Sequence, residues 1–345
     1  MRVATAVRGG IGVANPKAPN KVQPSNAALM ISYRFFTVIL TLAMWAGGLR
    51  AAVAAQAFII VDARTGYVLQ EQESKQKRQV GSLTKIATAS VVLDWAEHKS
   101  GDLNQTVTIP PEAFVGAGEN NIKFQPGDAI SLRDLLYAAL VQSDNIAAYA
   151  LAHHVGSTIS SVAPAASDAK ITPVDIFVSQ MNALAKQLKM DRTHFVNPHG
   201  IDDNVKSLPF STAEDMGRLS CYAMNKAAFR FYVSQKTRQI NFQRGSHKLG
   251  YLLRNTNELV GTRGIDGVKT GRTAHAGECL VLSANREAEI VKQGPMTTVY
   301  PRHIIVVLLG SANRFAEGAG LVERGWQLYD QWAAAGRLVD PKKNL

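Results

Sequence analysis

Two kinds of hydrophobic pattern divide the chain. Near both ends, short runs rich in β-branched residues predict strands. These are a hairpin over residues 57–72 and single strands over 265–273, 278–285 and 302–310. Between them, apolar positions three or four apart predict helices over residues 82–97, 131–141, 145–155, 174–189 and 211–226. A short strand over 105–110 and a final helix over 315–334 complete the predicted elements.

This order of elements predicts an α+β fold. Both ends of the mature chain are expected to form one mainly antiparallel sheet, flanked by helices, with a helical subdomain. We expect a single domain over residues 55–335, interrupted by a helical insert at about 98–260 and followed by a short tail at 336–345. Residues 157–173 and 286–301 are predicted to be loop insertions.

The N-terminal segment differs in composition from the rest. Residues 35–49 are fifteen uncharged residues between Arg34 and Arg50, followed by two Ala-x-Ala sequences. This run is short for a membrane span but typical of a signal-peptide core. We therefore expect residues 1–54 to be a signal peptide with an N-terminal extension. Either Met1 or Met30 can be the start, and the cleavage site stays open.

The net charge is also distributed differently between the N-terminal segment and the rest of the chain. Six basic groups and no acids lie in residues 1–54, so the rest of the 345-residue chain carries +5 of the +11 formal charge. No basic stripe alternates with aromatic residues, so we expect no nucleic-acid partner.

Cys221 and Cys279 are too few for a disulfide scaffold and wrongly spaced for zinc, and whether they pair is left open. The histidines form no H-E-x-x-H pattern, so neither a metal nor another cofactor is expected.

The stretch G-S-L-T-K at residues 81–85 opens a predicted helix that is apolar almost all round. Ser82 and Lys85, three positions apart, share one side of that helix. A serine becomes a nucleophile when a base takes its proton, and burial or a neighbouring cation lowers the pKa of a lysine enough for that task. Ser-x-x-Lys also occurs at Ser74 and Ser167, but there in polar sequence.

Two further segments complete the candidate site. Ser143-Asp144-Asn145 follows the apolar run L-L-Y-A-A-L-V, and Lys269-Thr270-Gly271 lies on a predicted strand. Ser143 is either a helix cap or a hydroxyl that relays a proton beside Lys85. Asn145 would offer its amide to a substrate carbonyl. A glycine inside a strand indicates close approach of another backbone, so an extended peptide can pair along this edge.

Together, the motifs S-x-x-K at 82–85, S-D-N at 143–145 and K-T-G at 269–271 are the signature of penicillin-binding proteins and class A β-lactamases. From about Ala57 to Trp332 the chain resembles the serine D-alanyl-D-alanine carboxypeptidases, the low-molecular-weight penicillin-binding proteins. The resemblance implies a β-lactamase/transpeptidase-like fold. It also implies an exported enzyme of the periplasm or the outer face of the cytoplasmic membrane. Its substrate would be a peptidoglycan stem peptide ending in D-Ala-D-Ala.

The resemblance also implies roles for the site residues. Ser82 would attack the carbonyl between the two D-alanines, Lys85 would act as the base, and Ser143 would pass the proton to the leaving amine. Lys269 and Thr270 would hold the terminal carboxylate. The backbone N–H groups of Ser82 and Arg272 would form the oxyanion hole. β-Lactams would trap Ser82 as covalent inhibitors.

The chain departs from the family pattern in three places. Val80-Gly81 replaces the usual Pro-Ala, Asp144 replaces a glycine, and Arg272 replaces a common histidine, which puts substrate preference in doubt. No C-terminal β domain and no C-terminal membrane anchor are expected.

Other functions stay open. A D,D-endopeptidase that cleaves cross-links has the same motifs, and an inactive wall-binding module is a third possibility. A β-lactamase is disfavoured because Glu214 and Glu258, the only glutamates between Asn145 and Lys269, lack an asparagine four residues on.

Overall fold

The structure is a computed structural model, and it describes residues 54–98, 101–160 and 171–345. The predicted signal peptide lies outside the described residues, except for its last position. No helix in the described ranges has both the length and the apolar character needed to cross a membrane.

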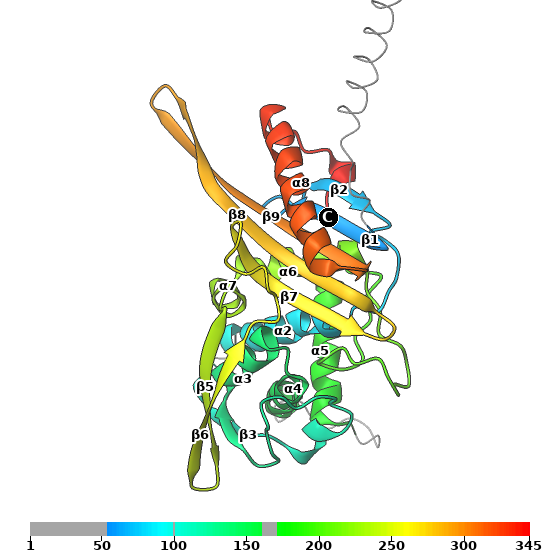
Figure 1. The fold of residues 1–345 in the computed structure, drawn as a ribbon, viewed down its shortest axis with the longest axis vertical. Coiled ribbons are helices and arrows are strands. Elements are labelled where there is room, and N and C mark those ends of the chain that lie inside the picture. Colours follow the sequence, from blue (N-terminus) through cyan, green and yellow to red (C-terminus); the bar gives the residue numbers. More distant parts are fainter. Residues whose placement is uncertain (1–53, 99–100, 161–170) are drawn as a thin grey trace, which may run out of the picture. The chain divides into compact units, whose positions relative to one another are not determined.

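A five-stranded antiparallel sheet forms the centre of the fold, in the order β2-β1-β9-β8-β7 (Figure 1). Its strands are β1 (Ala57–Asp62), β2 (Val68–Gln72), β7 (Ile265–Thr273), β8 (Gly277–Gln293) and β9 (Met296–Ser311). Strand β1 pairs with β9, so that Ile60 faces Val306. The first and last strands of the domain are therefore neighbours, and the predicted α+β class with one sheet built from both ends is confirmed.

Both faces of this sheet are buried, because successive side chains of a strand point to opposite sides. Ile59 and Val61 of β1 join the core on one face, and Phe58 and Ile60 join the core on the other. Helix α8 (Arg314–Ala334) packs on the second face through residues that include Trp326 and Tyr329 (Figure 1). The first face packs against the segment between β2 and β7, and the candidate site residues Ser82, Lys85, Ser143 and Asn145 lie in that segment.

The segment between β2 and β7 is mainly helical and also contains four strands in the described residues, of which only the one near 105–110 was predicted. Its helices are α2 (Lys85–His98), α3 (Leu132–Val141), α4 (Asn145–Ser160), α5 (Pro173–Gln187), α6 (Ala213–Asn225) and α7 (Ala227–Val233). A second sheet, in the order β3-β4-β5-β6, lies among them. Its strands are β3 (Thr106–Thr108), β4 (Ala129–Ser131), β5 (Thr237–Arg244) and β6 (His247–Arg254). Along β5 only Ile240 and Phe242 are fully buried, so its hydrophobic signal is weak.

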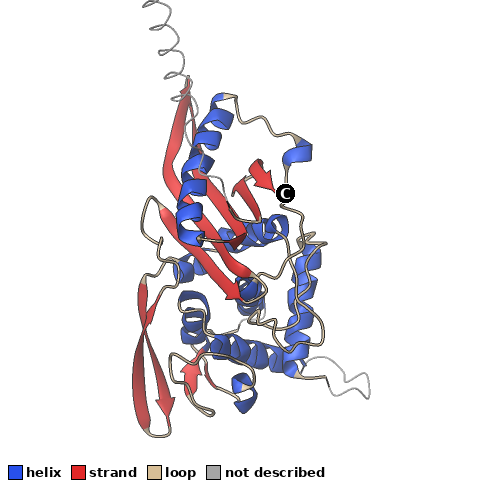
Figure 2. Ribbon diagram, turned by 45° about the vertical axis from the view of Figure 1, so that its right-hand side comes forward, coloured by secondary structure: helices blue, strands red, loops and turns tan. Residues whose placement is uncertain are grey.

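The predicted loop at 286–301 is also wrong. Strands β8 and β9 continue through this segment and pair with each other, for example at Ile290 and Val299 (Figures 1 and 2). The two strands satisfy each other's backbone hydrogen bonds, so the ribbon forms although most of its side chains are exposed. The predicted loop at 157–173 is shortened by α4, which extends to Ser160, and residues 161–170 lie outside the described ranges.

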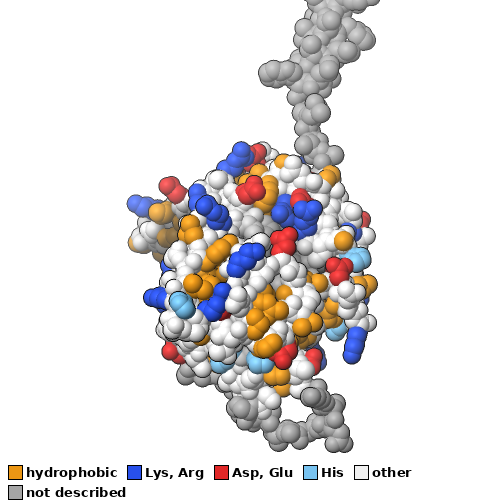
Figure 3. Space-filling view, turned by 60° about the horizontal axis from the view of Figure 1, so that its bottom comes forward, with side chains coloured by type: hydrophobic (Ala, Val, Ile, Leu, Met, Phe, Trp, Pro, Cys, Tyr) orange, Lys and Arg blue, Asp and Glu red, His pale blue; other side chains and the backbone are white. Residues whose placement is uncertain are grey.

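Charged side chains of both signs are interspersed with apolar ones on the face shown in Figure 3. Cys221 and Cys279, whose pairing the sequence left open, are both free thiols. Burial raises the pKa of Cys279 to about 11, which keeps this thiol protonated at neutral pH.

Candidate active site

Ser82 lies in a 3₁₀ turn, and the α-helix begins three residues later. The turn covers Gly81–Thr84, and α2 starts at Lys85, so the predicted helix start at Ser82 is three residues early. In a 3₁₀ turn, residues i and i+3 lie one above the other. The Nζ atom of Lys85 accordingly lies 2.8 Å from the Oγ atom of Ser82.

Lys85 is fully buried and has two further hydrogen-bond partners. Its Nζ atom lies 2.6 Å from Oδ1 of Asn145 and 3.0 Å from the carbonyl oxygen of His199. Burial lowers the pKa of Lys85 to about 7, although the nearby carboxylate of Asp144 opposes this shift. A neutral amine has two N–H groups and one lone pair. With Asn145 and His199 accepting the two hydrogens, the lone pair can face the hydroxyl of Ser82.

Asn145 is the first residue of α4 and connects the lysine to a neighbouring loop. Its Oδ1 accepts from Lys85, and its Nδ2 donates to the carbonyl oxygen of Ala117 at 2.7 Å. The amide nitrogen has a second hydrogen, which neither of these bonds uses. Asn145 can therefore donate to a ligand while holding Lys85.

Ser143 occupies the turn before α4 in a left-handed conformation, with φ of 65°. In the described residues, the hydrogen bonds of Lys85 go to Ser82, Asn145 and His199, and none joins it to Ser143. The neighbouring Asp144 is buried and caps α4 by accepting from the backbone N–H of Ala147 at 2.7 Å. Burial raises the pKa of Asp144 to about 6, against the opposing effects of this hydrogen bond and of Lys85.

Lys269, on β7, is buried and donates to the carbonyl oxygen of Thr270 at 3.0 Å. Its pKa is lowered well below the usual value by burial and further by the positive charges of Lys85 and Arg314. From the sequence, either burial or a neighbouring cation was expected to lower the pKa of Lys85. In the structure, burial is the cause of the lowered pKa of Lys85, and the charge effect acts on Lys269.

Strand β7 packs directly on the turn that carries Ser82. A Cβ atom on Gly271 would lie 2.4 Å from the carbonyl oxygen of Val80, so only glycine fits here. A Cβ atom on Gly81, which has φ of 53°, would lie 3.0 Å from the backbone nitrogen of Arg272. The backbone N–H of Arg272 is thus close to the Ser82 turn, and a side chain at either glycine would separate the two segments.

Two contacts that sequence reasoning missed hold β7. The hydroxyls of Thr256 and Thr270 lie 2.7 Å apart, and Nη1 of Arg314 donates to the carbonyl oxygen of Gly271 at 3.1 Å. Neither Thr256 nor Arg314 belongs to a recognisable motif, so no sequence signal identified them. Both act on the strand that would hold a substrate.

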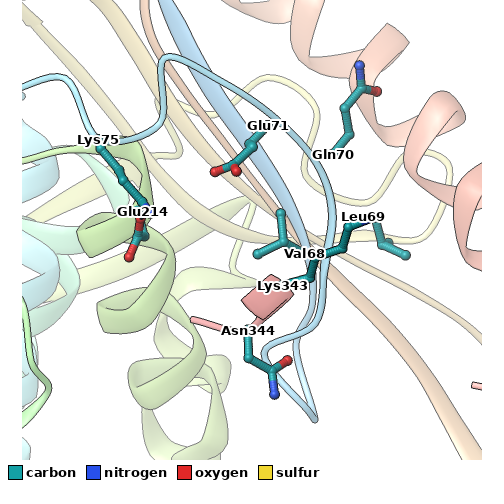
Figure 4. Close-up of a pocket in the computed structure, with 8 residues that line it drawn as sticks. All are labelled: Val68, Leu69, Gln70, Glu71, Lys75, Glu214, Lys343 and Asn344. Atoms are coloured by element: carbon teal, nitrogen blue, oxygen red, sulfur yellow. Dashed lines mark ion pairs between the residues drawn. The ribbon is translucent and has the colours of Figure 1, made fainter. Parts of the chain in front are cut away.

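A cavity of about 680 Å³ opens beside these residues. Asn145, His199 and Arg272 line it, together with the loop at 115–118 and residues 197–205. A second hollow of about 220 Å³ is lined by β2 residues and by Lys75, Glu214, Lys343 and Asn344 (Figure 4). In that hollow Lys75 lies 3.6 Å from Glu214, and none of the candidate site residues lines it. The larger cavity is therefore the candidate substrate cleft.

Residues 46–293 match the family model for D-alanyl-D-alanine carboxypeptidases, and this match includes all three motifs. The chain belongs to this family. The resemblance drawn from the motifs is thereby confirmed, as is the prediction of a carboxypeptidase-type hydrolase at the level of the family. The family match does not assign roles to individual side chains, so the roles of Ser82, Ser143 and the other site residues stay predictions.

Three known relatives are about 30% identical to this chain over the residues that align. The carboxypeptidase DacC of Escherichia coli is 30% identical over 287 residues, covering 81% of this chain but only 63% of DacC. A carboxypeptidase of Streptomyces sp. strain K15 is 32% identical over 233 residues, covering 66% of this chain and 75% of the relative. A D-alanyl-D-alanine endopeptidase of Pseudomonas aeruginosa is 28% identical over 281 residues, covering 81% and 78%.

Solved structures of a DD-transpeptidase and a penicillin-binding protein have the same fold. The crystal structure of the Streptomyces K15 DD-transpeptidase superposes with a TM-score of 0.66 at 26% identity, covering 80% of this chain and 98% of that one. Penicillin-binding protein D2 of Listeria monocytogenes, in its ampicillin-bound form, superposes with a TM-score of 0.62 at 25% identity. These likenesses confirm the predicted transpeptidase-like fold.

Proposed function

We propose that the protein is a serine peptidase that removes the terminal D-alanine from peptidoglycan stem peptides. The observation that carries this proposal is the 2.8 Å contact between Ser82 Oγ and a buried lysine whose pKa is about 7. At neutral pH a large fraction of Lys85 is uncharged, so the amine can take the hydroxyl proton while the oxygen attacks.

In the proposed reaction, Ser82 Oγ forms a bond to the carbonyl carbon between the two D-alanines, and its proton moves to Lys85. The backbone N–H groups of Ser82 and Arg272 stabilise the resulting oxyanion. Ser143 relays the proton to the leaving amine as the C–N bond breaks, which requires its hydroxyl to turn towards Lys85. Lys269 and Thr270 hold the terminal carboxylate. Water then cleaves the acyl-enzyme.

A β-lactam would acylate the same serine, because its strained amide presents a carbonyl to Ser82 as the peptide does. The ampicillin-bound Listeria relative supports this part of the proposal. Of the two glutamates that could activate a water to hydrolyse the acyl-enzyme, Glu214 lines the second hollow and pairs with Arg218, and neither it nor Glu258 is among the described residues that line the cleft. Slow release of the penicilloyl group, rather than β-lactamase turnover, is therefore part of the proposal.

The decisive experiment is covalent labelling with a fluorescent penicillin. We expect the wild type to be labelled, Ser82→Ala to be unlabelled, and Ser179→Ala to be labelled like the wild type. Ser179 is a suitable control because it is an exposed serine on α5. An unlabelled wild type would overturn the proposal in favour of a wall-binding module, and rapid turnover of nitrocefin would favour a β-lactamase.

An endopeptidase is the second candidate, because two of the relatives carry that name. This chain aligns with 78% of the length of the Pseudomonas endopeptidase and 77% of that of the Escherichia endopeptidase, compared with 63% of the length of DacC. Release of D-alanine from a pentapeptide, compared with cleavage of a cross-linked dimer by the same preparation, separates the two activities. Faster cleavage of the dimer would assign the endopeptidase.

For either substrate the protein must act outside the cytoplasm, where peptidoglycan lies. We propose that it is exported to the periplasm or the outer face of the cytoplasmic membrane. Residues 1–54, with their uncharged run at 35–49, support this proposal. N-terminal sequencing of the protein from a cell envelope fraction tests it, and recovery from the cytoplasm with residues 1–54 intact would contradict it.

A further inference from the structure

The substrate cleft has charges of opposite sign on its walls. Arg272, at the end of β7, and Asp203, in the 197–205 segment, both line the cavity. Within the described part of the chain, no hydrogen bond or ion pair joins the Arg272 side chain to Asp203 or to any other residue. Arg272 is exposed, and the Asp203 side chain is 63% exposed. The Arg272 side chain can therefore meet a charged group on a ligand, and the exposed carboxylate of Asp203, whose only ion-pair neighbour in the described residues is His275, can do so with its remaining oxygen.

Asp203 is held near Arg272 by its chain neighbour. Asp202 is 2% exposed, and its Oδ2 accepts from Oγ1 of Thr273 at 2.7 Å. Asp203 follows Asp202 and Arg272 precedes Thr273, so this buried contact fastens the two charged residues to adjacent points of the wall. The third neighbour is His275, whose Nδ1 lies 3.8 Å from Oδ1 of Asp203 and 3.4 Å from Oδ1 of Asp202.

This end of the cleft lies apart from the group proposed to bind the terminal carboxylate. Lys269 and Thr270 do not line the cavity, whereas Asn145, Arg272 and Thr273 do. If the leaving D-alanine lies against Lys269 and Thr270, the cavity receives the other side of the scissile bond. It then holds the side chain of the residue that precedes the two D-alanines.

We propose that Arg272 and Asp203 form a subsite for a stem-peptide side chain that ends in a complete amino-acid group, carrying both an ammonium and a carboxylate. This inference rests on the proposed function. The guanidinium of Arg272 binds the carboxylate, with two parallel N–H donors matched to two oxygens. The carboxylate of Asp203 accepts from the ammonium. A diaminopimelyl side chain offers both charges, whereas a lysyl side chain offers only the ammonium.

Arg272 and Asp203 are expected to bind different groups of the substrate side chain, so replacing each should have a different effect. Arg272 contributes only with the diaminopimelyl side chain, because only that side chain carries a carboxylate. Asp203 contributes with both side chains, because both carry an ammonium. Removing the charge of Arg272 should therefore change the preference between the two substrates. Removing the charge of Asp203 should lower kcat/KM for both.

The experiment compares two pentapeptides that differ only at the third residue, L-Ala-γ-D-Glu-X-D-Ala-D-Ala with X either meso-diaminopimelate or L-lysine. D-Alanine release gives kcat/KM for each, and the ratio of the two values is the readout. We expect the wild type to prefer the diaminopimelyl peptide by about tenfold, the size of one charge-assisted hydrogen-bonded contact. The acylation rate with benzylpenicillin, which lacks this side chain, is measured for every variant.

Arg272→Gln should lower the ratio to near one, Arg272→Lys should retain part of it, and Asp203→Asn should lower kcat/KM for both peptides. Lys186→Gln, which removes an exposed positive charge on α5 away from the cleft lining, should keep the wild-type ratio. For the Arg272 variants the readout is a ratio within each variant, so a general loss of reactivity or folding cancels. For Asp203→Asn, an unchanged benzylpenicillin acylation rate shows that the loss is confined to the peptides.

The outcomes separate the two proposals. A wild-type protein that benzylpenicillin does not acylate would contradict the proposed function. A wild type that is acylated but has a ratio near one, or an Arg272→Gln variant that keeps the wild-type ratio, would overturn the subsite alone.

Discussion

The side-chain oxygen of Asn145 lies 2.6 Å from the amine of Lys85, although 60 residues separate the two along the chain. The same side chain donates to Ala117 at 2.7 Å. Asn145 thus ties together the start of α2, the start of α4 and the loop that forms one wall of the cleft. The position of the proposed base is set by packing between these segments as well as by the helix that carries it.

Replacing Asn145 with alanine should lower the rate of Ser82 acylation by about 100-fold, since a misplaced general base and a lost substrate donor each raise the barrier. The rate of labelling with a fluorescent penicillin measures this effect. Asn121→Ala is a suitable control, because Asn121 is exposed and its side chain bonds only to Glu119 in the described residues. An Asn145→Ala variant as fast as this control would contradict the assigned role.

The acylation rate should rise as pH increases through about 7, because the pKa of Lys85 is about 7 and only the neutral amine accepts a proton. The negative charge of Asp144 raises the pKa of Lys85. Asp144→Asn removes that charge and keeps an oxygen to cap α4, so the midpoint of the pH profile should move to lower pH. Acylation rates across the neutral range test the shift.

Asp191→Asn is the control for this pH profile, since Asp191 is an exposed carboxylate outside the cleft lining. Its profile should coincide with that of the wild type. A shift to higher pH in Asp144→Asn would show that the sign of the electrostatic coupling is wrong.

Gly271→Ala should reduce acylation by about 100-fold, because a displacement of about 1 Å in a reacting geometry has an effect of that size. The added Cβ would lie 2.4 Å from the carbonyl oxygen of Val80, so β7 must move away from the Ser82 turn. Kinetics of penicillin acylation and circular dichroism of the folded variant measure the two effects separately. Full activity in Gly271→Ala would mean that the strand can shift without disturbing the site.

Two glycines of α8 should respond to alanine in opposite ways. Gly320 is exposed and has open space where a Cβ would lie, so Gly320→Ala should raise the free energy of unfolding by about 0.5–1 kcal/mol. A Cβ on Gly325 would lie 2.8 Å from Cδ1 of Ile304 and 2.9 Å from Cγ2 of Ile60. Gly325→Ala should therefore lower that free energy by about 1–3 kcal/mol. Urea denaturation measures both, and equal shifts would contradict the packing of α8 on the sheet.

Local patterns predicted those elements whose burial is strong. The continuous apolar run of β1 and the first nine residues of α2 are buried on all sides, so their hydrophobicity alone identifies them. The strands β5 and β6 were missed because only a few of their side chains are buried, and the segment 286–301 was assigned to a loop because its strands expose most of their surface. Exposed strand pairs are held together by backbone hydrogen bonds, and these do not require an alternation of hydrophobic and polar side chains that could be recognised in the sequence.

The sequence by itself determined the family, the order of the three motifs and the spacing of Ser82 and Lys85, because these depend on residue types and on the geometry of one helical turn. Only the tertiary structure decided that His199 and Asn145 hold the lysine, that Arg314 and Thr256 support β7, and that Asp203 shares a wall with Arg272. The hydrogen bonds among these contacts join residues that are 14 to 114 positions apart. Their distances are set by how the segments pack, which no local pattern encodes.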